Sequence, residues 1–274
     1  MAVKSPLKWV GSKARLMPQL LACLPKGKRL VEPFGGSCAV MLNTDYEEYL
    51  IGDANPDLVN LWRMMAYHPT PLIREIETLF AAGSVGDKNC RAEFYYVLRE
   101  RFNQNNGLSS LERAACFLFL NRHCYGGVCR YNQRGHFNTP CGHYEKPFLP
   151  KDEIHAFAEK AKQATFICAS FEETLQLVTA DDVVYCDPPY IPANTSANFT
   201  QYHTNGFAHY DQEYLVAKLF ALSLNGVPVI ASNSDTPQTR SLYARFNLTE
   251  LDAPRSIGAR SGGESTAKEL LAIR

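Results

Sequence analysis

The first sixty residues alternate between short apolar runs and longer stretches with helical spacing of apolar positions. Apolar runs at 29–31 and 49–52 have the length of buried strands. Residues 15–24 have the repeat of an amphipathic helix, and further helices are expected from about Cys38 and from Pro56. Strands that alternate with helices in this way predict an α/β fold with a parallel sheet.

The middle third of the chain has a different, mostly helical pattern. Three stretches repeat apolar residues with helical spacing, at 72–80, 92–102 and 111–121. Residues 129–139 instead resemble a β-hairpin with its turn at 133–135. We therefore expect a mainly helical domain that carries a hairpin.

The α/β pattern returns in the last third. Strand-like runs lie at 165–169, 183–186, 227–231, 248–255 and 269–273, the last two as a hairpin. A helix is expected from Asp211, as its N-cap, to Asn225, with Gly226 ending it. Residues 1–60 and 151–274 are thus predicted to form one Rossmann-like α/β domain, into which residues 61–150 are inserted.

Composition narrows the class of protein without identifying it. The chain has 274 residues, 46% of them apolar and 20% charged, as in ordinary globular proteins. It has neither a long apolar run nor a secretory leader pattern, so no membrane segment is expected. Nine cysteines, an odd number without framework spacing, favour reduced thiols in the cytoplasm.

Charge is balanced overall but uneven along the chain. Residues 99–151 hold eight lysines and arginines against three glutamates, with aromatic residues between them. This combination is typical of a nucleic-acid-binding surface. A solvated basic face is the alternative that these residues leave open.

The tetrapeptide Asp187-Pro188-Pro189-Tyr190 is the most informative motif. It follows the apolar run 183–186, so it is expected at the carboxyl end of a strand, where α/β proteins bind ligands. The carboxylate and an outward carbonyl can both accept hydrogen bonds from a planar amine, and the tyrosine ring can stack on a flat heterocycle. The prolines contribute no competing N–H donor.

A second set of residues indicates a mononucleotide-binding half. The strand at 29–31 enters a loop with Gly35 and Gly36, and the strand at 49–52 ends at Asp53. Glycine lets backbone approach a ligand closely, and an acid at the next strand end can accept from ribose hydroxyls. The loop lacks the glycine spacing of nicotinamide-dinucleotide sites. Asp53 as a turn or helix-capping residue is the alternative.

These motifs together resemble DNA adenine-N6 methyltransferases of the Dam type. The matching strings occur in family order at 7–13, 31–36, 52–58, 120–122, 129–132, 184–190 and 197–200. The order of the parts, with the glycine loop before the insertion and the tetrapeptide after it, resembles the α-type amino-methyltransferases. The resemblance implies that the insertion is a target-recognition domain.

The resemblance also implies S-adenosylmethionine as methyl donor, with no metal. Its implied contacts are Trp9, Lys13, Phe34, Gly36, Asp53, Ser170, Phe171 and Asp187. Asp187 and the Pro188 carbonyl would polarise the N6 amine of a flipped-out adenine, on which Tyr190 stacks, for direct attack on the methyl group. Residues 191–210 would cover the base. Cys38 departs from the family, where relatives often have glycine.

Double-stranded DNA is the implied partner, and GATC the implied target. By resemblance, Arg130 and Lys8 contact guanines, Val128 and Pro140 contact thymine, Tyr125 fills the stack and Tyr144 contacts the backbone. Gly126 and Val128 depart from the best-known member, which has Asn and Leu there. We expect a monomer, because a self-contained recognition domain needs no second subunit to recognise a short site.

Three alternatives remain open at this stage. The same chemistry could act at another short site, on N4 of cytosine or on RNA adenine. A catalytically inert DNA-binding relative is less favoured, because Asp53, Asp187 and Tyr190 are all present. A structural zinc site would draw on His123, Cys124, Cys129, His136, Cys141 and His143, but their spacing matches no common zinc pattern.

Overall fold

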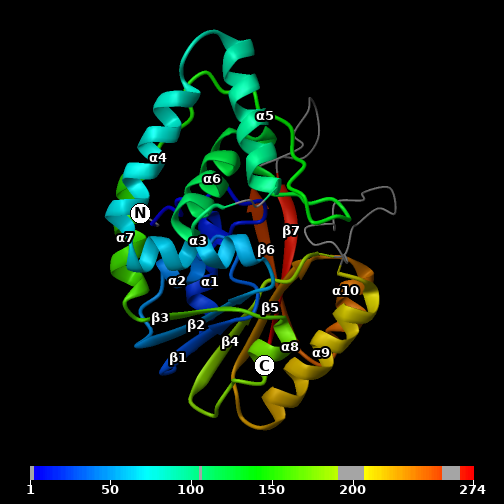
Figure 1. Cartoon of the computed structure of the whole chain (residues 1–274). Coiled ribbons are helices and arrows are strands. Elements are labelled where there is room, and N and C mark those ends of the chain that lie inside the picture. The colour runs from blue at the N-terminus through cyan, green and yellow to red at the C-terminus, as the bar shows by residue number, and fades with distance from the viewer. Residues whose placement is uncertain (1–2, 105–106, 191–206, 255–265) are drawn as a thin grey trace.

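The computed structural model describes residues 3–104, 107–190, 207–254 and 266–274. Within them, seven strands form one sheet in the order β3-β2-β1-β4-β5-β7-β6 (Figure 1). The strands are β1 (Arg29–Glu32), β2 (Glu48–Asp53), β3 (Ala164–Cys168), β4 (Asp182–Cys186), β5 (Val229–Ser234), β6 (Asn247–Pro254) and β7 (Thr266–Ile273). The predicted α/β, Rossmann-like fold is confirmed.

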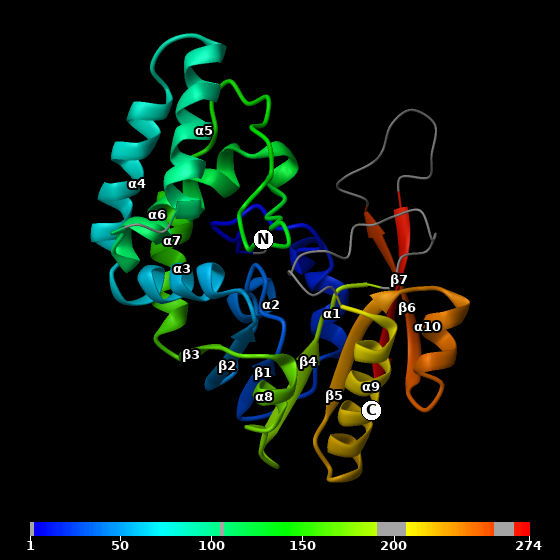
Figure 2. The same cartoon turned by 45° about the vertical axis from the view of Figure 1, so that its right-hand side comes forward.

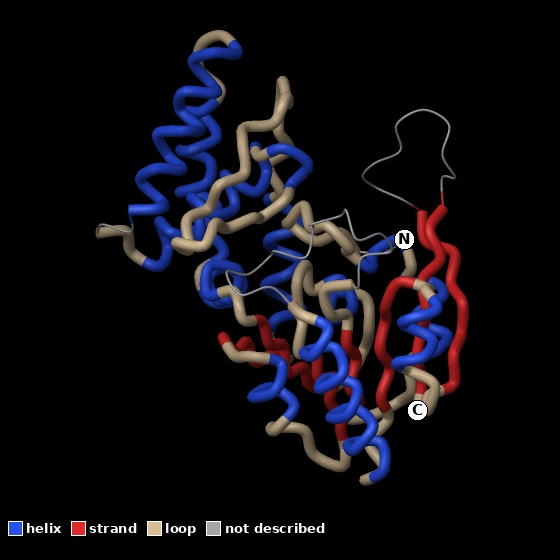
Figure 3. Tube along the Cα trace, turned by 90° about the vertical axis from the view of Figure 1, so that its right-hand side faces the viewer, coloured by secondary structure: helices blue, strands red, loops and turns tan. Residues whose placement is uncertain are grey.

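Strand direction determines where the site lies. β1 to β5 are parallel, whereas β7 runs antiparallel to β5 and to β6. The carboxyl ends of five strands therefore share one edge of the sheet, where ligands bind in open α/β folds. Figure 3 shows β6 and β7 as an extended pair at the end of the sheet.

The sheet is buried on both faces, as its continuous apolar runs predict. Alternate residues of β4 point to opposite sides: Val183 and Tyr185 join one core cluster, while Val184 and Cys186 join the other. Helices therefore cover both faces, and the sheet is the middle layer.

The helices flank the sheet and extend beyond it (Figures 1 and 2). They are α1 (Met17–Cys23), α2 (Ala39–Leu42), α3 (Pro56–Tyr67), α4 (Pro69–Gly83), α5 (Lys88–Gln104), α6 (Ser110–His123), α7 (Lys151–Ala161), α8 (Phe171–Leu175), α9 (His209–Leu224) and α10 (Pro237–Leu242), with short 3-10 turns η1 (Lys13–Arg15) and η2 (Tyr125–Gly127). α9 packs on β5. None of the helices in the described residues is long and apolar enough to span a bilayer.

The predicted N-cap of α9 is wrong by three residues. The helix begins at His209, and Ala208, in extended conformation, precedes it. Asp211 lies in the first turn, where its carboxylate accepts from the Ala208 N–H at 2.7 Å. An acid at this position accepts a hydrogen bond from the backbone N–H of the N-cap residue, which would otherwise have no partner within the helix.

Helices α4, α5 and α6 gather on one side, beyond the sheet (Figure 2). α4 packs against α6, and α5 packs against both. The predicted boundary between residues 60 and 61 lies inside α3, which packs on β3 and on α6. The division into 1–60 with 151–274 and 61–150 stays a prediction.

Candidate functional site

The glycine loop, Asp53 and Asp187 meet at the carboxyl edge of the sheet. The loop follows β1, Asp53 ends β2, and Asp187 follows β4. The Gly36 N–H donates to the Asp53 carboxylate at 3.3 Å, which joins the loop to the acid. The other Asp53 oxygen accepts from the Asn55 N–H at 2.9 Å. Asp53 thus caps the turn before α3 and also faces the loop.

Gly36 has a backbone that other residues rarely adopt. Its φ is +50°, and an added Cβ would lie 2.8 Å from Trp9 Nε1. The Trp9 ring therefore rests on the loop because Gly36 has no side chain. Cys38 also has positive φ, +54°, a conformation that glycine adopts without strain.

Four polar side chains form a network next to the loop. The Lys13 ammonium lies 2.8 Å from Asp187 Oδ1 and 3.6 Å from Glu269 Oε2. The Tyr190 hydroxyl donates to Glu269 Oε2 at 2.8 Å, and Lys13 Nζ lies 4.8 Å from the centre of the Tyr190 ring. Burial raises the pKa of Asp187 and of Glu269, and the Lys13 charge opposes the rise in each. We call this set the Lys13 network.

Aromatic rings lie together at the same edge. Phe34 stacks with Phe171 at a centroid distance of 5.7 Å, and Phe207 packs edge-on against both. Ser170 caps α8 with its side chain, which sets the position of Phe171. The expected cover at 191–210 lies mostly outside the described residues.

Lys8 and Tyr144, both predicted to contact DNA, touch each other. Lys8 Nζ lies 3.5 Å from the centre of the Tyr144 ring and donates to the Arg122 carbonyl at 3.0 Å. Burial lowers the pKa of Lys8 to about 8, and the positive charge of Arg122 makes a smaller contribution in the same direction. The ammonium thus makes a cation–π contact with the tyrosine ring.

The remaining predicted DNA contacts lie on two adjacent backbone segments. The Tyr125 N–H donates to the Pro140 carbonyl at 2.9 Å, and Tyr125 is 56% exposed. Thr139 Oγ1 donates to the Val128 carbonyl at 2.6 Å, and the exposed Arg130 donates from Nε to Asn138 at 2.7 Å. The structure therefore groups all six residues around the end of α6.

The predicted hairpin is only partly present. Tyr131 and Phe137 form an isolated bridge rather than a two-stranded ribbon. Two backbone hydrogen bonds cross the hairpin, from the Asn132 N–H to the His136 carbonyl and from the Asn138 N–H to the Arg130 carbonyl. Side chains supply the other bonds: Asn132 Oδ1 accepts from the N–H groups of Arg134 and His136, and Thr139 bonds both Val128 and Arg130. Such local bonds compete with strand pairing, and this explains the difference.

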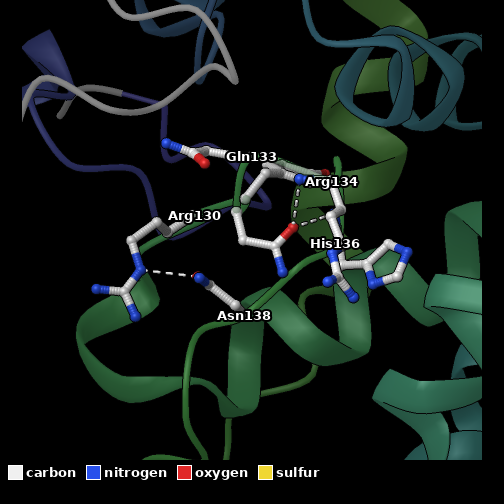
Figure 4. A pocket seen from close by; sticks show the side chains of 7 residues that line it. Arg130, Gln133, Arg134, His136 and Asn138 are labelled. Atoms are coloured by element: carbon white, nitrogen blue, oxygen red, sulfur yellow. Dashed lines mark hydrogen bonds between the residues drawn. The ribbon is translucent and has the colours of Figure 1, made fainter.

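This segment encloses an open hollow of about 570 Å³. It is lined by Arg130, Tyr131, Asn132, Gln133, Arg134, His136 and Asn138. Figure 4 shows the Arg130 side chain beside Asn138, joined by the hydrogen bond from Arg130 Nε. The lining is rich in cations and amides, the groups that contact phosphates and base edges.

A segment that we call the strap, residues 7–13, connects the two groups of residues. Its Lys8 N–H donates to Asn121 Oδ1 at 2.9 Å, and Asn121 Nδ2 donates back to the Lys8 carbonyl at 2.7 Å. Further along, Trp9 covers Gly36 and Lys13 meets Asp187. One short segment thus contacts α6, the glycine loop and the tetrapeptide.

Comparison with known proteins identifies the family. Residues 9–257 match the model of the D12 class N6 adenine-specific DNA methyltransferase family. This chain belongs to that family.

Curated relatives agree over nearly the whole length. The retron Ec67 DNA adenine methylase of Escherichia coli is 48% identical, over 97% of this chain and 90% of the relative. DNA adenine methylases of Serratia marcescens and Salmonella typhi are 44% and 41% identical, over 97% and 94% of their own lengths. The predicted family is confirmed, and the enzyme is an adenine-specific DNA methyltransferase whose substrate is DNA.

Several side chains at this candidate site were missed by the sequence analysis. Gln212 donates to the Pro189 carbonyl at 2.6 Å, and Asn233 donates to Gln212 at 3.2 Å. Glu269 and Asn121 hold Tyr190 and Lys8, as described above. In the sequence, the only signal at Glu269 is that it is an acid at the start of the predicted strand at 269–273. Gln212 and Asn233 gave no local signal, because folding alone brings them to the tetrapeptide.

The residues considered for zinc have other contacts in this methyltransferase. His123 stacks on Phe119 at 3.7 Å, and burial lowers the pKa of His123 to about 4. Burial raises the pKa of the Cys124 thiol to about 12 and that of Cys129 further. Across the described ranges, no three His, Cys, Asp or Glu residues are grouped as metal ligands would be.

Proposed function

We propose that this enzyme transfers a methyl group from S-adenosylmethionine to N6 of a flipped-out adenine in duplex DNA, within GATC. The observation that carries the proposal is the position of Asp187 and Tyr190. They follow β4 at the carboxyl edge, beside the strap and the glycine loop. This is where an amine acceptor and a stacking ring would meet a bound methyl donor.

The residues at this edge fit S-adenosylmethionine. Gly36 lets the Trp9 ring lie directly against the loop, and the Asp53 carboxylate is oriented by the same loop. Phe34 and Phe171 offer flat apolar faces nearby. When bound, S-adenosylmethionine supplies a methyl group that its positively charged sulfur activates. The proposed contacts are Trp9, Lys13, Phe34, Gly36, Asp53, Ser170, Phe171 and Asp187.

Asp187 and Pro188 act on the target amine. The carboxylate accepts from one N6–H bond and the Pro188 carbonyl from the other, which draws the nitrogen toward tetrahedral geometry. The neighbouring Pro189 carbonyl is already bonded to Gln212, so it is not assigned this task. The protein thus orients and polarises the amine without a covalent intermediate.

Adenine N6 is paired and stacked in a duplex, so the base must leave the helix to reach Asp187. Tyr190 then stacks on the base, and its hydroxyl bond to Glu269 holds the ring. The exposed Tyr125 ring is available to fill the stack. Arg130 and Lys8 would contact guanines, Val128 and Pro140 thymine, and Tyr144 the DNA backbone.

Plasmid lacking adenine methylation tests this function. The DNA is incubated with enzyme and S-adenosylmethionine and then digested separately with two nucleases. One nuclease cuts GATC only when its adenine is methylated, and the other only when it is not. We expect cutting by the first and protection from the second, with Asp187→Ala as the inactive control. Labelled methyl incorporation without either change would reject GATC, and the modified base would then show whether the target is another adenine or cytosine N4.

A further inference from the structure

Glu269 belongs to no predicted contact set, yet it lies beside the tetrapeptide. Cys186 at the end of β4 pairs with Ala231 on β5, and Ala231 pairs with Ala272 on β7. Further along β5, Ser234 pairs with Glu269. Glu269 is therefore level with the residues that immediately follow Cys186, which are those of the tetrapeptide.

Its contacts connect it to both ends of that motif. Oε2 accepts from the Tyr190 hydroxyl at 2.8 Å and lies 3.6 Å from Lys13 Nζ, which is 2.8 Å from Asp187. The side chains of Lys13, Asp187 and Glu269 are 4%, 21% and 14% exposed, so water screens these charges weakly.

The network holds one cation between two acids. An ammonium has three N–H donors. Lys13 donates to the Gly11 carbonyl at 3.1 Å and lies within contact distance of Asp187, while Glu269 is slightly beyond hydrogen-bond distance. A small movement of Lys13 would therefore shift its charge from Asp187 to Glu269. With Glu269 as a second partner, Lys13 can leave Asp187 when the target amine approaches the carboxylate.

We propose that Glu269 is a positioning residue for methyl transfer, which holds the Tyr190 ring through its hydroxyl and takes the Lys13 ammonium when Asp187 accepts the adenine amine. This inference rests on the proposed roles of Asp187 and Tyr190. Glu269 itself touches neither substrate. Its effect is on the rate of the bound complex rather than on binding.

Glu269→Gln tests the charge, because the amide oxygen can still accept from Tyr190. We expect kcat to fall by about tenfold or more, with KM for DNA and for S-adenosylmethionine within about threefold of wild type. Glu250→Gln is the matched control: it removes an acid of β6 that pairs with Arg240 and Lys268 at the surface, and kcat should not change. A Glu269→Gln enzyme with wild-type kcat would overturn the proposal.

Tyr190→Phe tests the anchor separately and serves if Glu269→Gln is unstable to heat. It keeps the ring but removes the bond to Glu269, so kcat should fall by about threefold or more at unchanged KM. The double variant Tyr190→Phe with Glu269→Ala should lower kcat by less than the product of the two single effects, because both substitutions remove the same hydrogen bond. If the effects of the two substitutions on kcat simply multiplied, Glu269 would not act through Tyr190 and the proposal would fail. If the variants lost thermal stability and both KM values rose together, the role of Glu269 would be merely structural. If the wild-type enzyme itself transferred no methyl group to DNA adenine, the proposed function would be rejected instead.

Discussion

Replacing Asn121 with alanine should weaken the binding of both proposed substrates, although Asn121 touches neither. The side chain is fully buried in α6 and makes a reciprocal pair of hydrogen bonds with the backbone of Lys8. It also donates to the Gly127 carbonyl at 3.3 Å. Alanine leaves these groups without their partner. Each lost hydrogen bond costs a net free energy of roughly 0.5–1.5 kcal/mol, so losing three should lower the free energy of unfolding by about 2–4 kcal/mol.

The strap gives this loss a kinetic consequence. Lys8, Trp9 and Lys13 all lie on it, so KM for DNA and for S-adenosylmethionine should both rise, by about three- to thirtyfold. Thermal unfolding should occur roughly 4–16 °C lower.

Asn103→Ala is a matched control for Asn121→Ala. Asn103 makes the same reciprocal pair with the backbone of Phe137, at 2.8 and 3.0 Å, but both of these bonds go to the segment that holds Arg130. It should raise KM for DNA alone. If Asn121→Ala raised only KM for DNA, or neither, the strap would not transmit the effect and the reasoning would fail.

Three further predictions follow from the site. Asp187→Ala should reduce methyl transfer below about one part in a thousand while DNA affinity, measured by gel shift, stays within about fivefold; near-normal turnover would refute the proposed role of the carboxylate. Arg130→Ala should reduce discrimination at one guanine by about 1–3 kcal/mol, seen in methylation of single-base variants of GATC, whereas equal weakening on every sequence would make it a phosphate contact. Burial raises the pKa of Glu32 from 4.5 to about 8. The protonated carboxyl therefore contributes fully to the free energy of unfolding below pH 4.5, and this contribution is lost as pH rises through 8. Glu32→Gln should therefore flatten the fall in melting temperature between pH 5 and 9, and a parallel fall in both proteins would contradict this.

Most of the fold could be predicted because burial of the sheet leaves a strong local pattern. The runs at 29–31 and 183–186 became β1 and β4 with ends shifted by one residue at most. We did not predict α7, although its buried Ile154, Phe157 and Ala161 follow helical spacing. Shorter α8 and α10 have too few residues for periodicity and depend on their caps.

The site could be predicted only where one short string carries the chemistry. Asp187 and Tyr190 could be proposed from the sequence because a strand precedes them and two prolines lie between them. Glu269 and Gln212 could not be found this way, since β7 and α9 reach the tetrapeptide only through tertiary pairing. The hairpin was overestimated because side-chain bonds of Asn132 and Thr139 do not appear in an alternating pattern.

The strap explains why residues so close in sequence belong to two different contact sets. Lys8 is fixed to α6 by Asn121, whereas Lys13 is fixed to the tetrapeptide by Asp187. Trp9 and the Ser12 hydroxyl, which accepts from Ser37 at 2.9 Å, hold the segment between them to the glycine loop. A displacement of Lys8 toward DNA would therefore act on the residues that we propose as contacts of the methyl donor. By thermodynamic reciprocity, such a coupling would change the affinity of each proposed site by the same factor when the other is occupied.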